Sequence, residues 1–351
     1  MSYLLPLAIY LLVLLGHRVL PAREVAGYVR DENGQPLRYR LNGLFVFGST
    51  IGLWVLACRS GLLAWDFFYT QRWPMAIGAC LTGLVFSAAM LVGAKAVRSL
   101  PADFYLGRRE NPRAFGVDAK MYLYLAGATM LGLNLASFAA HHVVTHVDVS
   151  PGVLLHTALF GFFLVDYLWF EEIHLYTYDL FAERVGFKLG WGCLVFYPFF
   201  YACGLWAVAD RPNPHSPAAC SVLAAMIFFS GWFLSRGANL QKFLWKTAPG
   251  KKLLGVVPQQ GLGEGQRTLL VSGFWGLSRH INYLGEIMMA LGLALSLGYP
   301  TAPGPWLYPI YYLVLLLPRE RDDDRRCEQK YGALWAEYRA RVPWRVVPKL
   351  Y

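Results

Sequence analysis

The sequence predicts an all-α fold, a polytopic transmembrane helical bundle of about nine to ten helices with a cytoplasmic C-terminal tail. Of its 351 residues, 56% are apolar and only 15% are charged. An ordinary soluble domain carries roughly one-quarter charged residues, so this composition argues against a water-soluble globule. Apolar stretches that approach the bilayer-crossing length of about 20 residues recur along the whole chain.

Nine of these stretches are expected to form membrane helices. They run from 3 to 16, 43 to 58, 74 to 97, 121 to 140, 152 to 170, 189 to 209, 217 to 234, 268 to 298 and 306 to 317. The first is assigned as a helix and not as a signal peptide, because no basic segment precedes it and no clear cleavage site follows it. No soluble domain or internal repeat is evident, so residues 1–351 are expected to form a single membrane-embedded domain.

The positions of the basic residues predict the orientation of the chain. The net charge is +10, and alternate loops hold 27 Lys and Arg residues, whereas the opposite loops hold only Arg59, Arg72 and Arg211. Basic loops favour the cytoplasmic side, which places the N-terminus outside and the C-terminus inside. The basic loops are residues 17–42, 98–120, 171–188, 235–267 and 319–351. Because this charge follows the membrane boundary, no nucleic-acid partner is expected.

The cysteines indicate neither disulfide bonds nor a metal site. They form no CxxC pair, and most of them lie in apolar stretches. The six are Cys58, Cys80, Cys193, Cys203, Cys220 and Cys327.

Three groups of charged residues lie where a charge is costly unless it is paired or faces water. The first group occupies the sequence DYLWFEEIHLYTYD, near the end of the fifth stretch. Its members are Asp166, Glu171, Glu172, His174 and Asp179. Either this group is an interfacial belt of acidic and aromatic residues, or it contributes to a functional site.

The second group interrupts the eighth stretch, in the sequence LLVSGFWGLSRHINYLGEIMMALGLAL. Its members are Arg279, His280, Asn282, Tyr283 and Glu286. A broken helix at membrane depth is tolerated only where its backbone is buried in protein or lines a cavity. Arg279 and Glu286 could form a structural ion pair, but a ligand site is the favoured interpretation.

The third group is basic and consists of Arg236, Lys242 and Lys246, joined by Arg319 of the tail. Lys242 and Lys246 are four residues apart, so on a helix they share one face and form a phosphate-sized patch. Binding to anionic lipid headgroups is the alternative. No GxGxxG or GxxxxGK[ST] loop is present to indicate a Rossmann or P-loop fold.

Four motifs resemble the sterol reductase family, which includes sterol delta-14 reductases, the sterol domain of the lamin B receptor and 7-dehydrocholesterol reductase. They are GRRENPR (107–113), SRGANLQK (235–242), LLVSGFWGLSRHINYLGE (269–286) and CEQKYGALWAEYRARVPWRVVPKLY (327–351). The chain departs from the family pattern at Glu286, Pro318 and Asp322, and it lacks ELRPG after Lys120.

The resemblance implies ten membrane helices and an NADPH pocket in about residues 235–351. It implies that Lys242 and Lys246 bind the 2'-phosphoadenosine end, with basic groups suited to phosphates and aromatic rings suited to stacking. The cofactor-binding residues carried over are Lys242, Lys246, Trp275, Arg279, Asn282, Tyr283, Arg319, Asp323, Cys327, Tyr331 and Tyr338. No metal is implied.

The implied reaction is reduction of a sterol ring double bond. An isolated alkene has no carbonyl to polarise, so an acid must protonate one carbon while hydride reaches the other. Glu286, Asp166 and Glu171 are candidate proton donors, because burial favours a neutral carboxyl group. The sequence does not rank them.

A delta-14 substrate is slightly preferred over delta-7 or delta-24. The RHxNYxG element also resembles isoprenylcysteine methyltransferases that use S-adenosylmethionine, and a nonenzymatic sterol-binding scaffold is the third alternative. The expected partners are a sterol and the lipid bilayer, and the oligomeric state stays open. The expected location is the inner membrane in a bacterium or the endoplasmic reticulum in a eukaryote.

Overall fold

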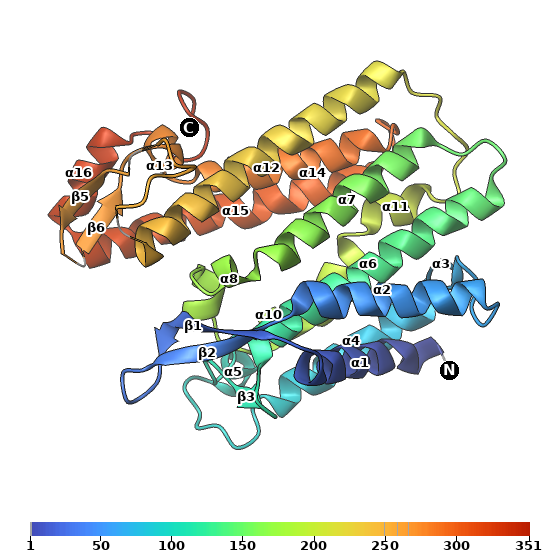
Figure 1. Cartoon of the computed structure of the whole chain (residues 1–351), viewed down its shortest axis with the longest axis horizontal. Helices are drawn as coiled ribbons and strands as arrows, with labels where there is room; N and C mark the ends of the chain where they lie inside the picture. Colours follow the sequence, from blue (N-terminus) through green and yellow to red (C-terminus); the bar gives the residue numbers. More distant parts are fainter. Residues whose placement is uncertain (1, 249, 258, 266) are drawn as a thin grey trace. The chain divides into compact units, whose positions relative to one another are not determined.

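The computed structural model describes residues 2–248, 250–257, 259–265 and 267–351. Helices dominate it, and its only sheets within these ranges are three antiparallel strand pairs (Figure 1). This confirms the all-α polytopic class. The chain divides into two compact units, Met1–Pro214 and His215–Tyr351. The predicted pocket region, about 235–351, lies in the second unit, and the single domain stays a prediction.

The first unit is built from long helices joined by short helices and hairpins. Its elements are η1 (Ser2–Leu4), α1 (Leu5–Val19), β1 (Arg23–Arg30), β2 (Pro36–Leu41), α2 (Gly43–Arg59), α3 (Phe67–Thr70), α4 (Arg72–Ala89), α5 (Leu100–Leu106), β3 (Arg113–Ala114), β4 (Val117–Asp118), α6 (Ala119–Thr145), α7 (Pro151–Trp169), α8 (Glu171–His174), α9 (Tyr178–Phe181), α10 (Phe187–Trp191), the π-helical η2 (Gly192–Phe200) and α11 (Cys203–Val208).

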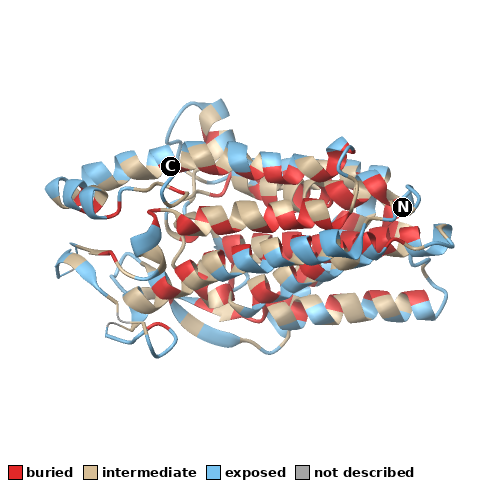
Figure 2. Cartoon of the chain, turned by 90° about the horizontal axis from the view of Figure 1, so that it is seen from above, coloured by how far each residue is buried: buried red, intermediate tan, exposed pale blue. Residues whose placement is uncertain are grey.

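Helix α6 forms the core of the first unit. Its side chains are buried on nearly every face. Figure 2 colours the buried residues of the chain red. The Asp118 carboxylate caps the helix by accepting hydrogen bonds from the backbone N–H groups of Lys120 (3.0 Å) and Met121 (3.2 Å). Asn134 donates to the carbonyl of Pro198 in η2 at 2.8 Å, so the irregular helix is hydrogen-bonded to the core.

The second unit contains three long helices and a small hairpin. Its elements are α12 (Ala218–Thr247), β5 (Gly261–Glu264), β6 (Arg267–Leu270), α13 (Phe274–Leu277), α14 (Ile281–Ser296), α15 (Pro303–Tyr331) and α16 (Ala333–Arg341).

Most predicted spans correspond to observed helices. Among the residues that the structure describes, five helical segments are long and apolar enough to cross a membrane, and α2 and α14 are shorter apolar helices. The five segments are Ser2–Val19, Ala119–Thr145, Pro151–Trp169, Phe187–Val208 and Ala218–Thr247. The chain is therefore a polytopic integral membrane protein.

Four predicted boundaries were wrong. The stretch predicted at 74–97 is helical only to Ala89, and the stretch predicted at 217–234 continues as α12 to Thr247. The last stretch, predicted at 306–317, extends into the tail as α15. The eighth stretch, 268–298, begins in strand β6 and continues through the short helix α13, and its long helix α14 starts only at Ile281.

Gln241 explains where the eighth stretch is broken. Its side-chain oxygen accepts from the Phe274 backbone N–H at 2.9 Å, and its nitrogen donates to the Ser272 carbonyl at 2.9 Å. Gly273 lies between them with φ +61°, and a Cβ there would lie 2.6 Å from the Gln241 amide. A buried glutamine thus satisfies the non-helical backbone, as the broken helix requires.

Glycines allow α12 and α14 to pack closely. A Cβ on Gly285 would lie 2.5 Å from the Gly231 carbonyl oxygen and 2.5 Å from the Ser235 backbone nitrogen. Both obstacles are backbone atoms, so the helices would have to separate to accommodate a side chain. Small residues at such crossings are typical of membrane helix pairs.

We expect Gly285→Ala to destabilise the protein by about 1–3 kcal/mol, because the added methyl group overpacks the helix crossing. The thermal unfolding midpoint of purified protein in detergent measures this effect. Gly161→Ala in α7 is the matched control, since no atom lies within 4 Å of its added Cβ. Equal midpoints for the two variants would contradict the prediction.

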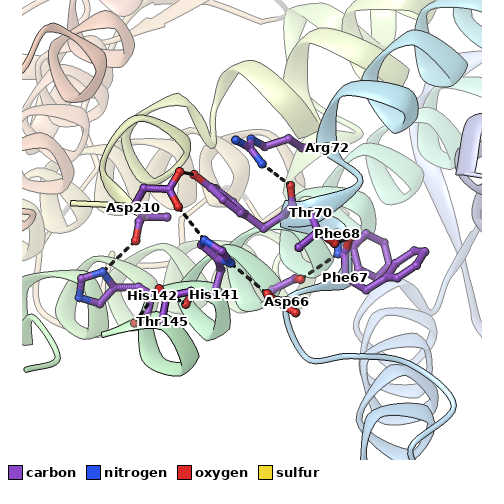
Figure 3. A network of polar contacts seen from close by, with 12 residues as sticks. Asp66, Phe67, Phe68, Thr70, Arg72, His141, His142, Thr145 and Asp210 are labelled. Carbon is purple, nitrogen blue, oxygen red and sulfur yellow. Dashed lines mark hydrogen bonds and ion pairs between the residues drawn. The ribbon is translucent and has the colours of Figure 1, made fainter. Parts of the chain in front are cut away.

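A polar network joins three segments at one end of the first unit (Figure 3). The His141 ring lies between two carboxylates: Nδ1 is 3.0 Å from Asp66 Oδ2, and Nε2 is 2.7 Å from Asp210 Oδ1. Tyr69 stacks on His141 with ring centroids 4.0 Å apart and donates its hydroxyl to Asp210 at 2.6 Å. The Arg72 guanidinium lies 3.9 Å from the Tyr69 ring centroid.

Hydrogen bonds fix the tautomer of the neighbouring His142. Its Nε2 accepts from the Ser150 backbone N–H at 3.0 Å, which leaves Nδ1 to donate to the Ala209 carbonyl at 3.0 Å.

Candidate functional site

Four cations converge on the break before α14. Burial, reinforced by the charges of Lys242, Arg279, Arg319 and Arg345, lowers the pKa of His280 to about 3. The ring is therefore neutral at physiological pH, and it stacks on Tyr283 with centroids 4.7 Å apart. Concentrated positive charge of this kind favours a polyanionic ligand.

Lys242 and Trp275 form one wall of this cationic cluster. The Trp275 indole nitrogen donates to the Ala238 carbonyl at 2.8 Å, which fixes the ring against α12. The Lys242 ammonium nitrogen lies 5.2 Å from the Trp275 ring centroid, within cation–π distance. Lys246 follows one turn later on α12, and both lysine side chains are exposed. The predicted shared helical face is confirmed, because α12 extends beyond both residues.

Acidic residues of α15 bind the opposite side of the cluster. Tyr283 donates its hydroxyl to Asp323 at 3.0 Å, and Arg279 pairs with Asp324 at 3.4 Å. Asp324 also accepts from the Trp335 indole nitrogen at 3.1 Å. The alternative of a structural Arg279–Glu286 ion pair does not hold, since Arg279 is paired with Asp324. Glu286 instead accepts a hydrogen bond from the Ser235 hydroxyl at 2.6 Å.

The tail supplies the aromatic part of the cluster. Trp335 and Tyr338 stack with centroids 4.9 Å apart, and Cys327 and Tyr331 pack against the buried group they form. Tyr338 reaches the Trp275 carbonyl at 3.5 Å. Burial, with the nearby Asp323 carboxylate adding to it, raises the pKa of Cys327 to about 11. Cys327 is therefore a neutral thiol, which does not act as a nucleophile.

Two polar atoms in this cluster are buried without a hydrogen-bond partner in the described part of the chain. They are Arg279 Nε and Asn282 Oδ1. Buried donors and acceptors are normally satisfied, so orphaned ones call for an explanation such as a ligand. A donor and an acceptor beside several cations fit a nucleotide, which carries both phosphates and polar ring atoms.

The structure thus brings together the eleven predicted cofactor residues. Near one another lie Lys242, Lys246, Trp275, Arg279, Asn282, Tyr283, Arg319, Asp323, Cys327, Tyr331 and Tyr338, all in the second unit.

The sequence did not identify several residues that complete the cluster. The backbone nitrogens of Arg279 and His280 donate to the carbonyls of Trp344 (2.9 Å) and Arg345 (2.8 Å). Arg345 in turn pairs with the fully buried Glu320 at 3.2 Å. The C-terminal segment therefore folds back onto the break, a tertiary contact that no local pattern signals.

The three candidate proton donors divide between the units. Glu286 belongs to α14 of the second unit, whereas Asp166 of α7 and Glu171 of α8 are buried in the first. Both Glu171 carboxyl oxygens lie 3.2 Å from the Gly43 backbone nitrogen, at the start of α2. Burial raises the pKa of Glu171 to about 7, against the lowering influence of the Gly43 hydrogen bond and of Arg23.

This raised pKa predicts a specific pH dependence of stability. The fold favours the neutral carboxyl group, so the contribution of Glu171 is complete below its unfolded pKa and is lost as the pH rises through about 7. Between about pH 5 and 8, we expect wild type to lose about 1–3 kcal/mol relative to Glu171→Gln, which stays neutral.

Thermal unfolding in detergent across that pH range measures the effect. Glu172→Gln is the control, because Glu172 pairs with Arg23 at the surface and is more exposed than Glu171. Parallel pH profiles for wild type and Glu171→Gln would refute the assignment.

The whole chain, residues 1–351, matches the model of the ergosterol biosynthesis ERG4/ERG24 family. The chain belongs to this family. Its relatives in the ERG4/ERG24 family include the Delta(14)-sterol reductase of Arabidopsis thaliana, 32% identical over 95% of this chain and 91% of the relative. The Delta(14)-sterol reductase of Methylotuvimicrobium alcaliphilum is 32% identical over 94% of this chain and 79% of the relative. The mouse Delta(14)-sterol reductase TM7SF2 is 33% identical over 95% of this chain and 82% of the relative.

Membership of the ERG4/ERG24 family confirms the resemblance to sterol reductases. The match extends over both units, including the N-terminal helices that the four motifs did not cover.

Proposed function

We propose that this protein reduces the delta-14 double bond of a sterol with NADPH. Relatives that cover most of the chain carry the name Delta(14)-sterol reductase, which supports the reaction over methyl transfer or passive sterol binding. The observation that carries the cofactor assignment is the cationic and aromatic cluster around His280, with its orphaned Arg279 and Asn282 atoms.

The residues of the cluster divide the work of holding the cofactor. Lys242 and Lys246 would hold the 2'-phosphate, and Arg319 and Arg279 would hold the diphosphate. Asn282 and Asp323 hydrogen-bond to polar groups, while Trp275, Tyr331 and Tyr338 present rings for stacking. When bound, NADPH supplies the hydride. Tyr283 of α14 donates its hydroxyl to Asp323 of α15 at 3.0 Å, which holds the two helices together beside the cluster.

The protein must also supply a proton to the sterol alkene. Glu171 has a pKa of about 7, so near neutral pH a substantial fraction of it carries the proton that a general acid needs. Glu286 and Asp166 are the other candidates. Hydrogen bonding from Ser235 orients Glu286, and the buried Asp166 lies one turn from the end of α7.

We assign the cofactor cluster and the C-terminus to the cytoplasmic side of the membrane. The loops that carry most of the Lys and Arg residues support this orientation. NADPH is a soluble charged molecule, so it would reach the cluster from the aqueous side, whereas a sterol would reach the protein from the bilayer.

Incubating membranes that contain the protein with NADPH and separate delta-14, delta-7 and delta-24 sterols tests the reaction. Mass spectrometry should detect a two-hydrogen gain with the delta-14 sterol and none in membranes without the protein. A two-hydrogen gain only with a delta-7 or delta-24 sterol would show that the protein reduces that double bond and not the delta-14 bond.

Titration of the purified protein with NADPH and with S-adenosylmethionine tests whether it is a reductase, a methyltransferase or a nonenzymatic scaffold. Binding of S-adenosylmethionine alone would replace the proposal with a methyltransferase, and binding of neither would favour a scaffold.

A further inference from the structure

The turn between β3 and β4 presents an exposed phenylalanine. Ala114 pairs with Val117, so Phe115 and Gly116 form a two-residue turn, and both have positive φ (+54° and +76°). This turn favours Asn, Asp or Gly, because a β-carbon crowds the backbone at positive φ. Yet the residue present is Phe115, whose side chain is 82% exposed. The strained turn therefore brings the Phe115 side chain into little contact with the rest of the protein.

The Phe115 ring closes one side of a groove on α1. The groove has a volume of about 410 Å³ and is lined by Leu11, Leu14, Leu15, Arg18 and Phe115. This volume lies within the range of small-molecule sites, about 300–1,000 Å³. Leu11 and Leu15 are exposed, so the walls of the groove are apolar and accessible from outside the first unit.

Arg18 supplies the charge at one end of this groove. It follows Leu11, Leu14 and Leu15 at seven, four and three residues, so it lies on the same face of α1. The side chain is exposed, and within the described residues it has no hydrogen-bond or ion-pair partner. A Cβ on Gly116 would lie 3.8 Å from Arg18 Nε, which places the strained turn beside the guanidinium.

Arg18 also stands at the end of a helix that is long and apolar enough to cross a membrane. The apolar segment Ser2–Val19 is long enough to cross a membrane, and Arg18 is its second-last residue. A guanidinium at this position faces phosphates, while the three leucines face acyl chains.

We propose that this groove binds an anionic phospholipid. Arg18 pairs with the phosphodiester, and the leucines and Phe115 hold the adjoining part of one acyl chain. The apolar walls favour a lipid over a soluble phosphate. The single unpaired cation favours a lipid with net negative charge over a zwitterionic one. The site is independent of the proposed cofactor cluster, since all of its residues belong to the first unit.

Native mass spectrometry of the full-length protein in detergent tests the site. Phosphatidylglycerol and phosphatidylcholine with the same acyl chains are added separately, and bound lipids are counted. We expect phosphatidylglycerol to bind more tightly, and Arg18→Gln to weaken it about fivefold, the effect of one basic residue near a membrane surface. Arg59→Gln is the matched control, because Arg59 is another exposed arginine at a helix end, in α2. It should change nothing.

Phe115→Asn separates lipid binding from folding. Asn adopts positive φ readily, so this variant should unfold at a higher temperature and at the same time retain less of both lipids. A stability gain with unchanged lipid binding would remove Phe115 from the site.

Three results would overturn the proposal as a whole. The first is equal binding of phosphatidylglycerol and phosphatidylcholine by wild type. The second is an equal loss of phosphatidylglycerol binding in Arg18→Gln and Arg59→Gln. The third is displacement of phosphatidylglycerol by glycerol phosphate at the same concentration, which would show that the groove recognises only a soluble phosphate.

Discussion

Reversing the charges of Lys242 and Lys246 together should weaken NADPH binding about 100-fold and leave NADH binding nearly unchanged. The two cofactors differ only in the 2'-phosphate, so a selective loss reports on that group. A hydrogen bond to a charged group contributes about 1.5–3 kcal/mol, and two of them account for this factor. Titration of purified Lys242→Glu/Lys246→Glu protein with each cofactor measures both affinities.

Lys251→Glu/Lys252→Glu is the matched control for the reversal. It carries the same charge change on two exposed lysines of the same unit, beyond the end of α12. This control variant should bind both cofactors like wild type. Equal losses for NADPH and NADH in the Lys242/Lys246 variant would remove the 2'-phosphate assignment. Equal losses of NADPH affinity in the two double variants would show that the effect comes from the net charge of the protein and not from the positions of Lys242 and Lys246.

Arg319→Gln should give folded protein whose turnover is at least about 100-fold lower. Arg319 contributes to the positive field at His280, together with Lys242, Arg279 and Arg345. Removing one positioned donor from a charged site costs enzymes about 100- to 1,000-fold in rate. Glutamine keeps most of the side chain's length, so the thermal unfolding midpoint should stay near that of wild type. Product formation from a delta-14 sterol measures the turnover.

Arg321→Gln, two residues along α15, is the control for this variant. Its side chain is exposed, and the substitution removes the same charge. Turnover should match that of wild type. Normal turnover in Arg319→Gln would dismiss Arg319 from the cofactor cluster even if the reaction itself is confirmed.

Apolar periodicity predicted the membrane helices well where their ends coincide with the membrane boundary. The stretches predicted at 43–58 and 152–170 match α2, Gly43–Arg59, and α7, Pro151–Trp169. The prediction failed at α12, because hydropathy locates the apolar layer and not the end of the helix. The polar sequence from Ser235 to Thr247 is a good helix former that simply extends beyond that layer.

Residue chemistry predicted the centre of the candidate site, but not its supports. Charge and spacing identified Arg279 and Tyr283 in one group and Lys242 in another, and the resemblance to sterol reductases implied that the two groups form one pocket. The structure places all three residues around His280. The choice of Asp324 as the partner of Arg279 depends on the rotation of α15, which three consecutive aspartates do not specify. Glu320 and Arg345 are 25 residues apart in the sequence, and they meet only because the C-terminal segment folds back. No local pattern predicts such a contact.

The prolines inside α15 divide this helix into two parts. Its 29 residues extend about 44 Å, with an apolar first half and with Arg319, Asp323 and Cys327 in its second half. Pro318 lies where the two halves meet, and a proline inside a helix removes one backbone hydrogen bond. The half that carries the charged residues can therefore bend at Pro318 while the apolar half keeps its packing.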